Sequence, residues 1–445
     1  MSDRPEPHTP SQITSSIDRR RFLQLAGVAG AAMSAPGLLA ACQVQSGSGG
    51  GAAQTIKLGY VSPETGPLAP FGEADSFVIG AVRKYFAQHG VTVAGKKYDV
   101  QIIVRDSQST DQQASNVAND LILNERVQLM LVSSTPDTTN PVSDACEANQ
   151  VPCISTVAPW QSWFVGRGGK PGQTSFNWTY HFFWGLEDLI SVYLDMWSGV
   201  SNNKVVGALW PNDPDGNAFA DQQLGFPAAI RPQGYSVVDP GRYQDLTTDY
   251  SAQIARYKAG GADILTGVPL PPDFTTFWKQ ARQQGYAPRV ATVAKALLFP
   301  SSVTALGDIA NNLGTEVWWT PSHPFSSSLT GQTSKQLADA YTASAKKQWT
   351  QPIGFAHALF EVANATLSRA KALNRSSIAA SIASLKIDTV VGPLDWTGGP
   401  VKNVAKTPLV GGQWRKGTTY PFDLIIVSNK DHTNIPSGGS MQPMS

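Results

Sequence analysis

The chain has 445 residues, 41% of them hydrophobic and 15% charged, and its formal net charge is +1. This near-neutral balance argues against a nucleic-acid-binding protein, because such proteins need a basic face. About 390 residues follow the N-terminal leader and tether described next, too many for a single hydrophobic core, so we expect two domains.

The first 42 residues have the composition of an export signal. Three arginines at 19–21 precede the weakly apolar run Phe22–Ala41, which contains Gln24, Pro36 and many small residues. A membrane-spanning helix needs about 20 strongly apolar residues, so this run is too polar to be one. A charged start, an apolar middle and a small-residue end are instead typical of a signal peptide.

Two motifs in this leader resemble known bacterial signals. Arg19 and Arg20 in DRRRFL resemble a twin-arginine pair, and LAAC at 39–42 resembles a lipobox. The second resemblance implies an acylated Cys42; the alternative is a leader with an accidental cysteine. We expect a twin-arginine-type lipoprotein signal at 1–42 and a flexible tether at 43–54. The mature protein is then exported and held by lipid on the periplasmic or cell-surface side of the membrane.

Beyond the tether, predicted strands and helices alternate, as in a parallel sheet with helices on both faces. The strands are expected at Thr55–Val61, Tyr98–Val104, Val127–Val132 and Val151–Ser155. The helices are expected at Phe77–Phe86, Thr110–Glu125 and Pro141–Asn149. A Gly-rich loop at Gly166–Gln173 then interrupts the alternation.

The alternation restarts after this loop, which predicts a second unit of the same kind. Its strands are expected at Lys204–Trp210, Tyr235–Val238, Ala262–Val268 and Arg289–Val293, and its helices at Asn217–Arg231, Thr247–Ala259 and Pro271–Gln284. A mostly helical segment follows at 334–385, and a terminal hairpin from Thr407 ends in Phe422–Val427. The predicted fold class is α/β, with two Rossmann-like lobes and a ligand site in the cleft between them.

Four segments resemble, in the same order, the leucine/isoleucine/valine-binding proteins, which are type I periplasmic solute-binding proteins of ABC importers. They are GYVSPETGPLAPFG at 59–72, VPCISTVAP at 151–159, FTTFWKQARQQG at 274–285 and DTVVGPLDW at 388–396. The resemblance runs from about residue 56 to about residue 427.

The resemblance implies a periplasmic binding protein-like fold, in which two lobes are joined by a three-strand hinge and close on a ligand. Lobe 1 would comprise residues 55–178 and 321–403, and lobe 2 residues 179–320 and 404–430, followed by a tail at 431–445.

In lobe 1, the family implies ligand contacts from three loops. Phe71 lies where the family commonly has an aromatic residue that covers the ligand, although it could equally pack on the next helix. Asp137, Thr138 and Thr139 begin a predicted helix, where they could cap the helix, hold a ligand carboxylate, or both. The loop after the next strand is expected to contribute Thr156, Ala158, Pro159 and Trp160.

In lobe 2, Trp210, Asp213 and Asp215 lie between a strand and a helix, and Pro269 occupies the next loop. The aspartates could meet a ligand cation or hydroxyl, or serve only as turn residues. Lys295 departs from the family's amino-acid binders, which have an acidic residue near this position for the ligand ammonium. Since a lysine repels an ammonium, an anionic or neutral ligand with an apolar or aromatic body gains support, unless Lys295 points to solvent.

Besides Cys42, the chain has only Cys146 and Cys153. In an exported protein these two could form a disulfide, and two buried free thiols are the alternative. Two thiols and scattered histidines do not make a metal site, so no metal or cofactor is expected.

The sequence therefore predicts a monomeric solute-binding protein that serves the permease subunits of an ABC importer. Its ligand is expected to be amino-acid-like, or an aromatic or apolar carboxylate or amide. The alternative is a ligand-sensing receptor domain of the same fold. An enzyme is not expected, because the chain has no phosphate-binding Gly loop, no nucleophile elbow and no His paired with a nucleophile.

Overall fold

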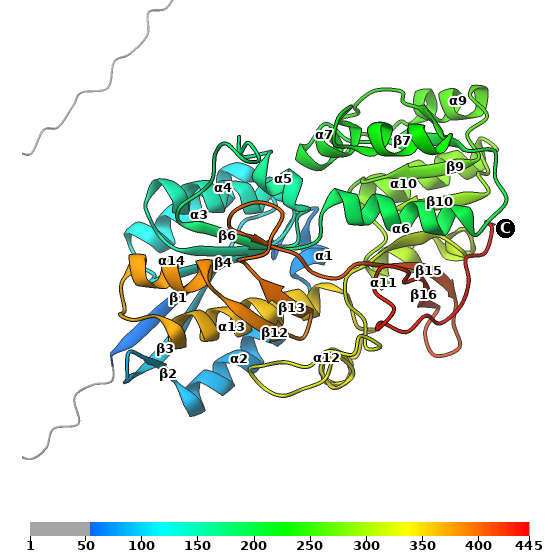
Figure 1. Ribbon diagram of the computed structural model, residues 1–445. Coiled ribbons are helices and arrows are strands. Elements are labelled where there is room, and N and C mark those ends of the chain that lie inside the picture. Colours follow the sequence, from blue (N-terminus) through cyan, green and yellow to red (C-terminus); the bar gives the residue numbers. More distant parts are fainter. Residues whose placement is uncertain (1–53, 445) are drawn as a thin grey trace, which may run out of the picture. The chain divides into compact units, whose positions relative to one another are not determined.

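Figure 1 shows the computed structural model of the protein, in which residues 54–444 are described. The expected signal with Cys42, and all of the tether except Gln54, lie outside the described residues. Two seven-stranded sheets, each flanked by helices, make up the described part. The α/β fold class with two lobes is confirmed. No helix between residues 54 and 444 is both long and apolar enough to cross a bilayer.

The first sheet has the strand order β14-β6-β5-β4-β1-β3-β2, and all its pairs are parallel except the hairpin of β2 and β3. Its strands are β1 (Thr55–Ser62), β2 (Val91–Val93), β3 (Lys96–Asp106), β4 (Leu129–Ser133), β5 (Cys153–Thr156), β6 (Thr179–Phe182) and β14 (Val404–Ala405).

Helices cover both faces of this sheet, which explains why its strands are apolar almost throughout. Leu58 and Tyr60 of β1 pack with α2 (Asp75–His89) and α13 (Pro352–Arg369). Val61, one residue on, packs on the opposite face with the helices α3 (Asp111–Leu123) and α4 (Pro136–Ala148). Helix α12 (Ser334–Ala345) packs beside α2 and α13, and α14 (Arg375–Ala383) beside α13.

The second sheet has the order β16-β15-β11-β10-β9-β7-β8. Its strands are β7 (Val205–Leu209), β8 (Ser236–Val238), β9 (Ile264–Gly267), β10 (Val290–Val293), β11 (Gly314–Val317), β15 (Val410–Lys416) and β16 (Phe422–Ser428). The predicted terminal hairpin forms as β15 and β16 and joins this sheet antiparallel to β11. Helices α6 (Leu186–Ser198) and α8 (Phe226–Ile230) cover one face, and α9 (Ser251–Ala259) and α10 (Pro271–Gln283) the other.

The remaining elements are short. They are the helices α1 (Ala69–Gly72), α5 (Trp160–Phe164), α7 (Pro214–Ala220) and α11 (Pro300–Thr304), the 3₁₀ turns Arg231–Gln233 and Gly307–Ala310, and the hairpin of β12 (Lys386–Thr389) and β13 (Gly392–Asp395).

The chain passes between the sheets three times, after β6, after β11 and after β14. Because β6 and β14 pair with each other inside the first sheet, the first and third crossovers lie a few residues later than the expected boundaries at 178 and 403. None of β6, β11 and β14, which are two to four residues long, was predicted.

Two predicted helices need correction. The helix expected at 141–149 begins at Pro136, with Pro141 inside it. The helix expected at 217–231 is broken into α7 and α8. Between them, Asp221 Oδ1 accepts hydrogen bonds from the backbone N–H groups of Gln223 and Leu224, both at 2.8 Å, which favours a turn over a helix.

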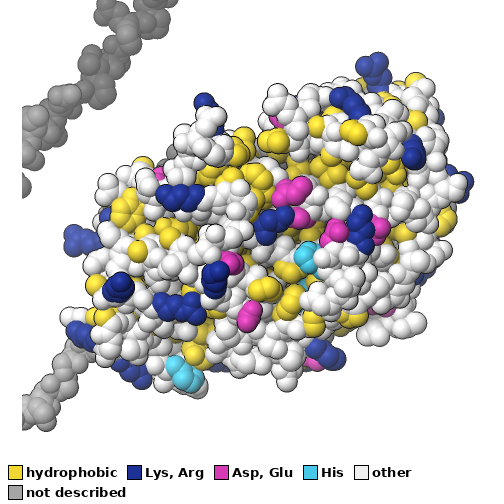
Figure 2. Space-filling model, viewed as in Figure 1, with side chains coloured by type: hydrophobic (Ala, Val, Ile, Leu, Met, Phe, Trp, Pro, Cys, Tyr) yellow, Lys and Arg dark blue, Asp and Glu magenta, His cyan; other side chains and the backbone are white. Residues whose placement is uncertain are grey.

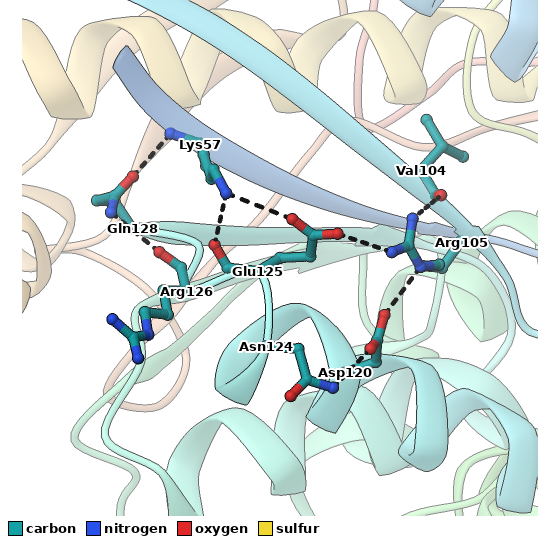
Figure 3. Close-up of polar contacts among 8 residues, drawn as sticks. All are labelled: Lys57, Val104, Arg105, Asp120, Asn124, Glu125, Arg126 and Gln128. Atoms are coloured by element: carbon teal, nitrogen blue, oxygen red, sulfur yellow. Dashed lines mark hydrogen bonds and ion pairs between the residues drawn. The ribbon is translucent and has the colours of Figure 1, made fainter. Parts of the chain in front are cut away.

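An ion-pair network ties α3 to the first sheet (Figure 3). Arg105 Nε lies 3.0 Å from Asp120 Oδ2, and its Nη2 lies 3.0 Å from Glu125 Oε1. Lys57 Nζ of β1 lies 3.3 Å from the other oxygen of Glu125. One carboxylate after the helix thus pairs with cations from two adjacent strands.

The disulfide considered for Cys146 and Cys153 is not formed in this structure, where both are buried free thiols. Burial raises the pKa of the Cys146 thiol, and the neighbouring Cys153 raises it further. Since the thiolate is the reactive form, this environment disfavours oxidation.

Candidate functional site

The two lobes meet over a small space, here called the inner cavity, at the carboxyl ends of both sheets. Its volume is about 20 Å³, about enough for one water molecule. Its lining comes from both lobes and two crossovers: Phe71, Thr135, Val157, Pro159, Phe183, Trp184, Asp215, Phe219, Val268, Ala294, Lys295, Glu316 and Trp318.

Aromatic rings form much of this lining. Phe71 of α1 packs edge-on against Phe299 with ring centroids 4.9 Å apart, and stacks on Trp318 at 6.5 Å. Phe183 lies 4.7 Å from Trp184 and 4.9 Å from Trp318. Such walls favour aromatic or apolar ligand bodies, by about 0.5–1.5 kcal/mol per ring pair beyond area burial.

A wider space, here called the outer groove, lies between α5 of the first lobe and α7 of the second. The volume of this groove is about 400 Å³. Its lining residues are Gln161, Ser162, Val165 and Gly166 in and after α5, Leu186 at the start of α6, and Asn212, Asp213, Pro214, Asn217, Ala218, Asp221 and Leu224 in and around α7. Figure 2 shows a hollow where the lobes meet, with apolar side chains along it and charged side chains gathered beneath.

An ion pair stands between the two spaces. Lys295 Nζ lies 2.8 Å from Asp213 Oδ2 and 3.1 Å from Asp215 Oδ2, and Lys295 is only 4% exposed. Asp213 lines the outer groove, whereas Asp215 and Lys295 line the inner cavity. The two spaces therefore adjoin at these three side chains.

The lysine is fixed by its surroundings. Its backbone has φ 63°, in the left-handed region that is rare for a residue with a side chain, and its N–H donates to Glu316 Oε1 at 2.9 Å. Burial lowers the pKa of Lys295, but Asp213 and Asp215 raise it more, so it lies well above its usual value and the ammonium is charged.

Carboxyl groups outnumber cations around this ion pair. Burial raises the pKa of Asp137 to about 6; Lys295 lowers it, and Asp213 and Asp215 raise it. Burial likewise raises the pKa of Glu316 to about 7. Lys295 does not point to solvent, and its charge is already compensated. Lys295 therefore gives the site no electrostatic preference for an anionic ligand.

The structure brings five of the predicted ligand-binding residues together. Phe71, Pro159, Asp215 and Lys295 line the inner cavity, and Asp213 lines the outer groove. Asp213 also caps α7, because its Oδ1 accepts from Gly216 N at 2.6 Å. Asp137 lies beside the cavity, where its Oδ2 accepts from the hydroxyl of Thr135 at 3.0 Å.

Other predicted residues have different contacts and line neither space. Thr139 Oγ1 donates to the Ser134 carbonyl at 2.9 Å, and Thr156 Oγ1 to the Phe182 carbonyl at 2.6 Å. The indole of Trp160 donates to Glu187 at 3.1 Å. The remaining four are buried away from both linings: Thr138, Ala158, Trp210 and Pro269.

The sequence did not point to Thr135, Trp184, Glu316 or Trp318. Thr135 directly precedes α4, whose start was placed five residues too late. Trp184 and Trp318 follow the short strands β6 and β11, which were not predicted. A signal was present, because aromatic residues cluster in FFWG at 182–185 and in WWT at 318–320.

This chain resembles a family model, a curated relative and two solved structures that all represent binding proteins. A family model described as periplasmic binding protein matches residues 55–419. A Leu/Ile/Val-binding protein homolog from Brucella suis is 30% identical over 227 residues, which are 50% of this chain and 53% of the relative. The chain thus spans about half the length of the curated relatives it matches.

Two solved structures share the fold at 17% identity. One is the branched-chain amino acid transporter substrate-binding protein LivJ from Streptococcus pneumoniae in complex with isoleucine, with a TM-score of 0.65 over 84% of this chain and 100% of that one. The other is an ABC transporter solute-binding protein from R. palustris in complex with 4-hydroxybenzoate, with a TM-score of 0.66 over 84% and 96%.

Proposed function

The chain belongs to the periplasmic binding protein family, and on this premise we propose that it captures a small solute between its two lobes and delivers it to the permease subunits of an ABC importer. The observation that carries the proposal is the inner cavity, whose lining comes from both lobes and from two of the crossovers. A solute in this place contacts all of these parts at once only when the lobes are closed.

Capture follows from this arrangement. A ligand that gains contacts only in the closed state shifts the population toward that state by its differential affinity. Phe71 contributes from the first lobe, and Asp215 and Lys295 contribute from the second. The cavity has room for about one water molecule, so the lobes must separate to admit a solute.

We infer that the solute is amino-acid-like, or an aromatic or apolar carboxylate or amide. The aromatic lining supports an aromatic or apolar body, and the neighbouring carboxyl groups can accept hydrogen bonds from an ammonium or amide group. The isoleucine and 4-hydroxybenzoate held by the two structural relatives fall within it. The proposed contact residues are Phe71, Asp137, Pro159, Asp213, Asp215 and Lys295.

We further propose that the protein is exported and held at the membrane by an acylated Cys42, with 43–54 as the tether. The order of the twin-arginine and lipobox motifs supports this. Metabolic labelling with a radioactive fatty acid should mark the wild type, and a Cys42→Ser variant should stay unlabelled.

A thermal-shift screen over amino acids, aromatic acids, amides and sugars tests the function. A solute at 100 times its dissociation constant should stabilise the folded protein by about 2.7 kcal/mol. Small-angle scattering with each hit should show a smaller radius of gyration, because the lobes close. If no solute stabilises the protein, or if hits leave the scattering unchanged, the proposal is wrong.

A further inference from the structure

Two tryptophans that line the inner cavity have indole N–H groups without a hydrogen-bond acceptor among the residues that the structure describes. Trp184 is 2% exposed and Trp318 is 3% exposed, their ring centroids lie 6.4 Å apart, and both line the cavity. Neither indole N–H has an acceptor among residues 54–444. A buried indole N–H normally finds a partner, because leaving it unpaired costs about 1–3 kcal/mol.

Most other buried tryptophans in the described part of the chain follow that rule, and Trp210, outside the cavity lining, is an exception. Trp197 donates to Thr292 at 2.9 Å, Trp278 to the Ile309 carbonyl at 2.8 Å and Trp414 to the Leu297 carbonyl at 2.7 Å. The unpaired donors at the cavity are therefore not a general feature of tryptophan in this fold. They also sit on two different crossovers, where a ligand contact would couple to closure.

The charge of the site decides what kind of acceptor suits these donors. The ammonium of Lys295 is paired with Asp213 and Asp215, and the carboxyl of Glu316 also lines the cavity. An anionic acceptor would meet this excess of carboxyl groups with no free cation among the lining residues. A neutral carbonyl oxygen accepts from both indoles without that repulsion, and an adjacent N–H₂ group can donate to a lining carboxylate.

We propose that Trp184 and Trp318 donate their indole N–H groups to the carbonyl oxygen of a neutral carboxamide with an aromatic or apolar body. This inference rests on the proposed function and narrows its solute class. The aromatic lining supplies the surface for the body of the solute, and the two donors select its polar end.

Three probes that share a ring and differ in the polar group test the solute class: benzamide, benzoate and benzylamine. Calorimetric titration of the wild type should show benzamide binding most tightly. Trp184→Phe and Trp318→Phe keep a ring and remove the N–H, so each should weaken benzamide binding about five- to tenfold. Trp210→Phe is the matched control, because its N–H also lacks an acceptor among the described residues but lines neither space.

The control should change the benzamide affinity less than about twofold, because Trp210 lines neither space. Tighter binding of benzoate or benzylamine than of benzamide overturns the inference, as does an unchanged benzamide affinity in both crossover variants. If benzamide fails while another solute of the wider screen binds, only this inference is wrong. If no solute of any class binds, the proposed function fails as well.

Discussion

Lys295 shows how a single buried charge organises the site. The residue is 4% exposed, and its ammonium lies within 3.1 Å of two carboxylates of the same lobe. Taking such charges out of water is costly, and mutual attraction repays the cost only when the pairing is complete. Removing one partner should therefore lower the free energy of unfolding more than replacing the whole ion pair by apolar residues would.

We expect Lys295→Met to destabilise the protein by about 3–5 kcal/mol at pH 7.5, because Asp213 and Asp215 would be left buried and unpaired. Urea unfolding measures this change. Lys335→Met is the matched control: Lys335 also pairs with an aspartate, Asp339, but its side chain is 70% exposed. The control should cost no more than about 1 kcal/mol. Equal effects of the two variants would mean that the Lys295 pair is not buried in solution.

The contribution of Glu316 to the stability of the folded protein depends on pH, and the direction of this dependence follows from its pKa. Burial raises its pKa from 4.5 to about 7, although hydrogen bonds from Lys295 N, Thr315 and Tyr193 partly oppose this. The folded protein then holds this proton more tightly than the unfolded chain does. This contribution to stability is greatest below pH 4.5 and is lost as the pH rises to about 7.

Glu316→Gln removes this titration. The stability of the variant relative to the wild type should therefore increase between pH 5 and pH 7.5, because only the wild type loses stability over that range. Urea unfolding of both proteins at the two pH values measures the difference. A difference that is flat, or that decreases toward pH 7.5, contradicts the raised pKa.

At the scale of elements, the residue at which a helix begins determines which side chains lie at the site. Helix α4 begins at Pro136, which suits the first turn because its missing N–H has no helical partner there. This early start places Thr135 at the cavity and Asp137 beside it. Helix α12 begins with a capping box, in which Thr333 Oγ1 accepts from Gln336 N at 3.2 Å and Gln336 Oε1 accepts from Thr333 N at 2.9 Å.

Thr333→Ala should destabilise the protein by about 1 kcal/mol, because it leaves an N–H of the first turn of α12 without its acceptor. Ser344→Ala on the exposed face near the end of the same helix should be neutral or slightly stabilising, since alanine has the higher helix propensity. Thermal unfolding compares the two. Similar melting temperatures would show that the cap contributes nothing.

At the scale of the molecule, closure depends on contacts across the crossovers. Glu187, in the first turn of α6, accepts from the Trp160 indole at 3.1 Å and from Gln161 Nε2 at 2.6 Å, and it pairs with Lys406 Nζ at 2.8 Å. Trp160 and Gln161 belong to α5 of the first lobe, and α6 packs on the second sheet. One carboxylate therefore joins both lobes and the third crossover.

Glu187→Ala should shift the protein toward the open form and weaken solute binding, because a smaller closed population lowers the apparent affinity by the same factor. Small-angle scattering without solute should show a larger radius of gyration than the wild type. Asp339→Ala, an exposed change on α12, serves as the control and should leave the scattering unchanged. A Glu187 variant as compact as this control would exclude a role in closure.

The sequence alone determined the strands and helices whose pattern is local. Apolar alternation placed β1 and β4, and helical spacing placed α3 and α10, because each pattern is set by neighbours within one element. The alternation of strands and helices, interrupted once at Gly166–Gln173, predicted the two-lobe architecture, and the order of four family-like segments agreed with it. The family resemblance also brought Phe71, Asp215 and Lys295 forward as site residues.

Only the tertiary structure decided how these residues meet. The Lys295 pair joins positions 82 residues apart, and Trp184 and Trp318 come together from separate crossovers. The short strands β6 and β14 are defined by their pairing, β6 with β5 and β14 with β6, which no local pattern records. Burial, pairing and pKa depend on the whole set of neighbours, so the acidic character of the site followed from the fold.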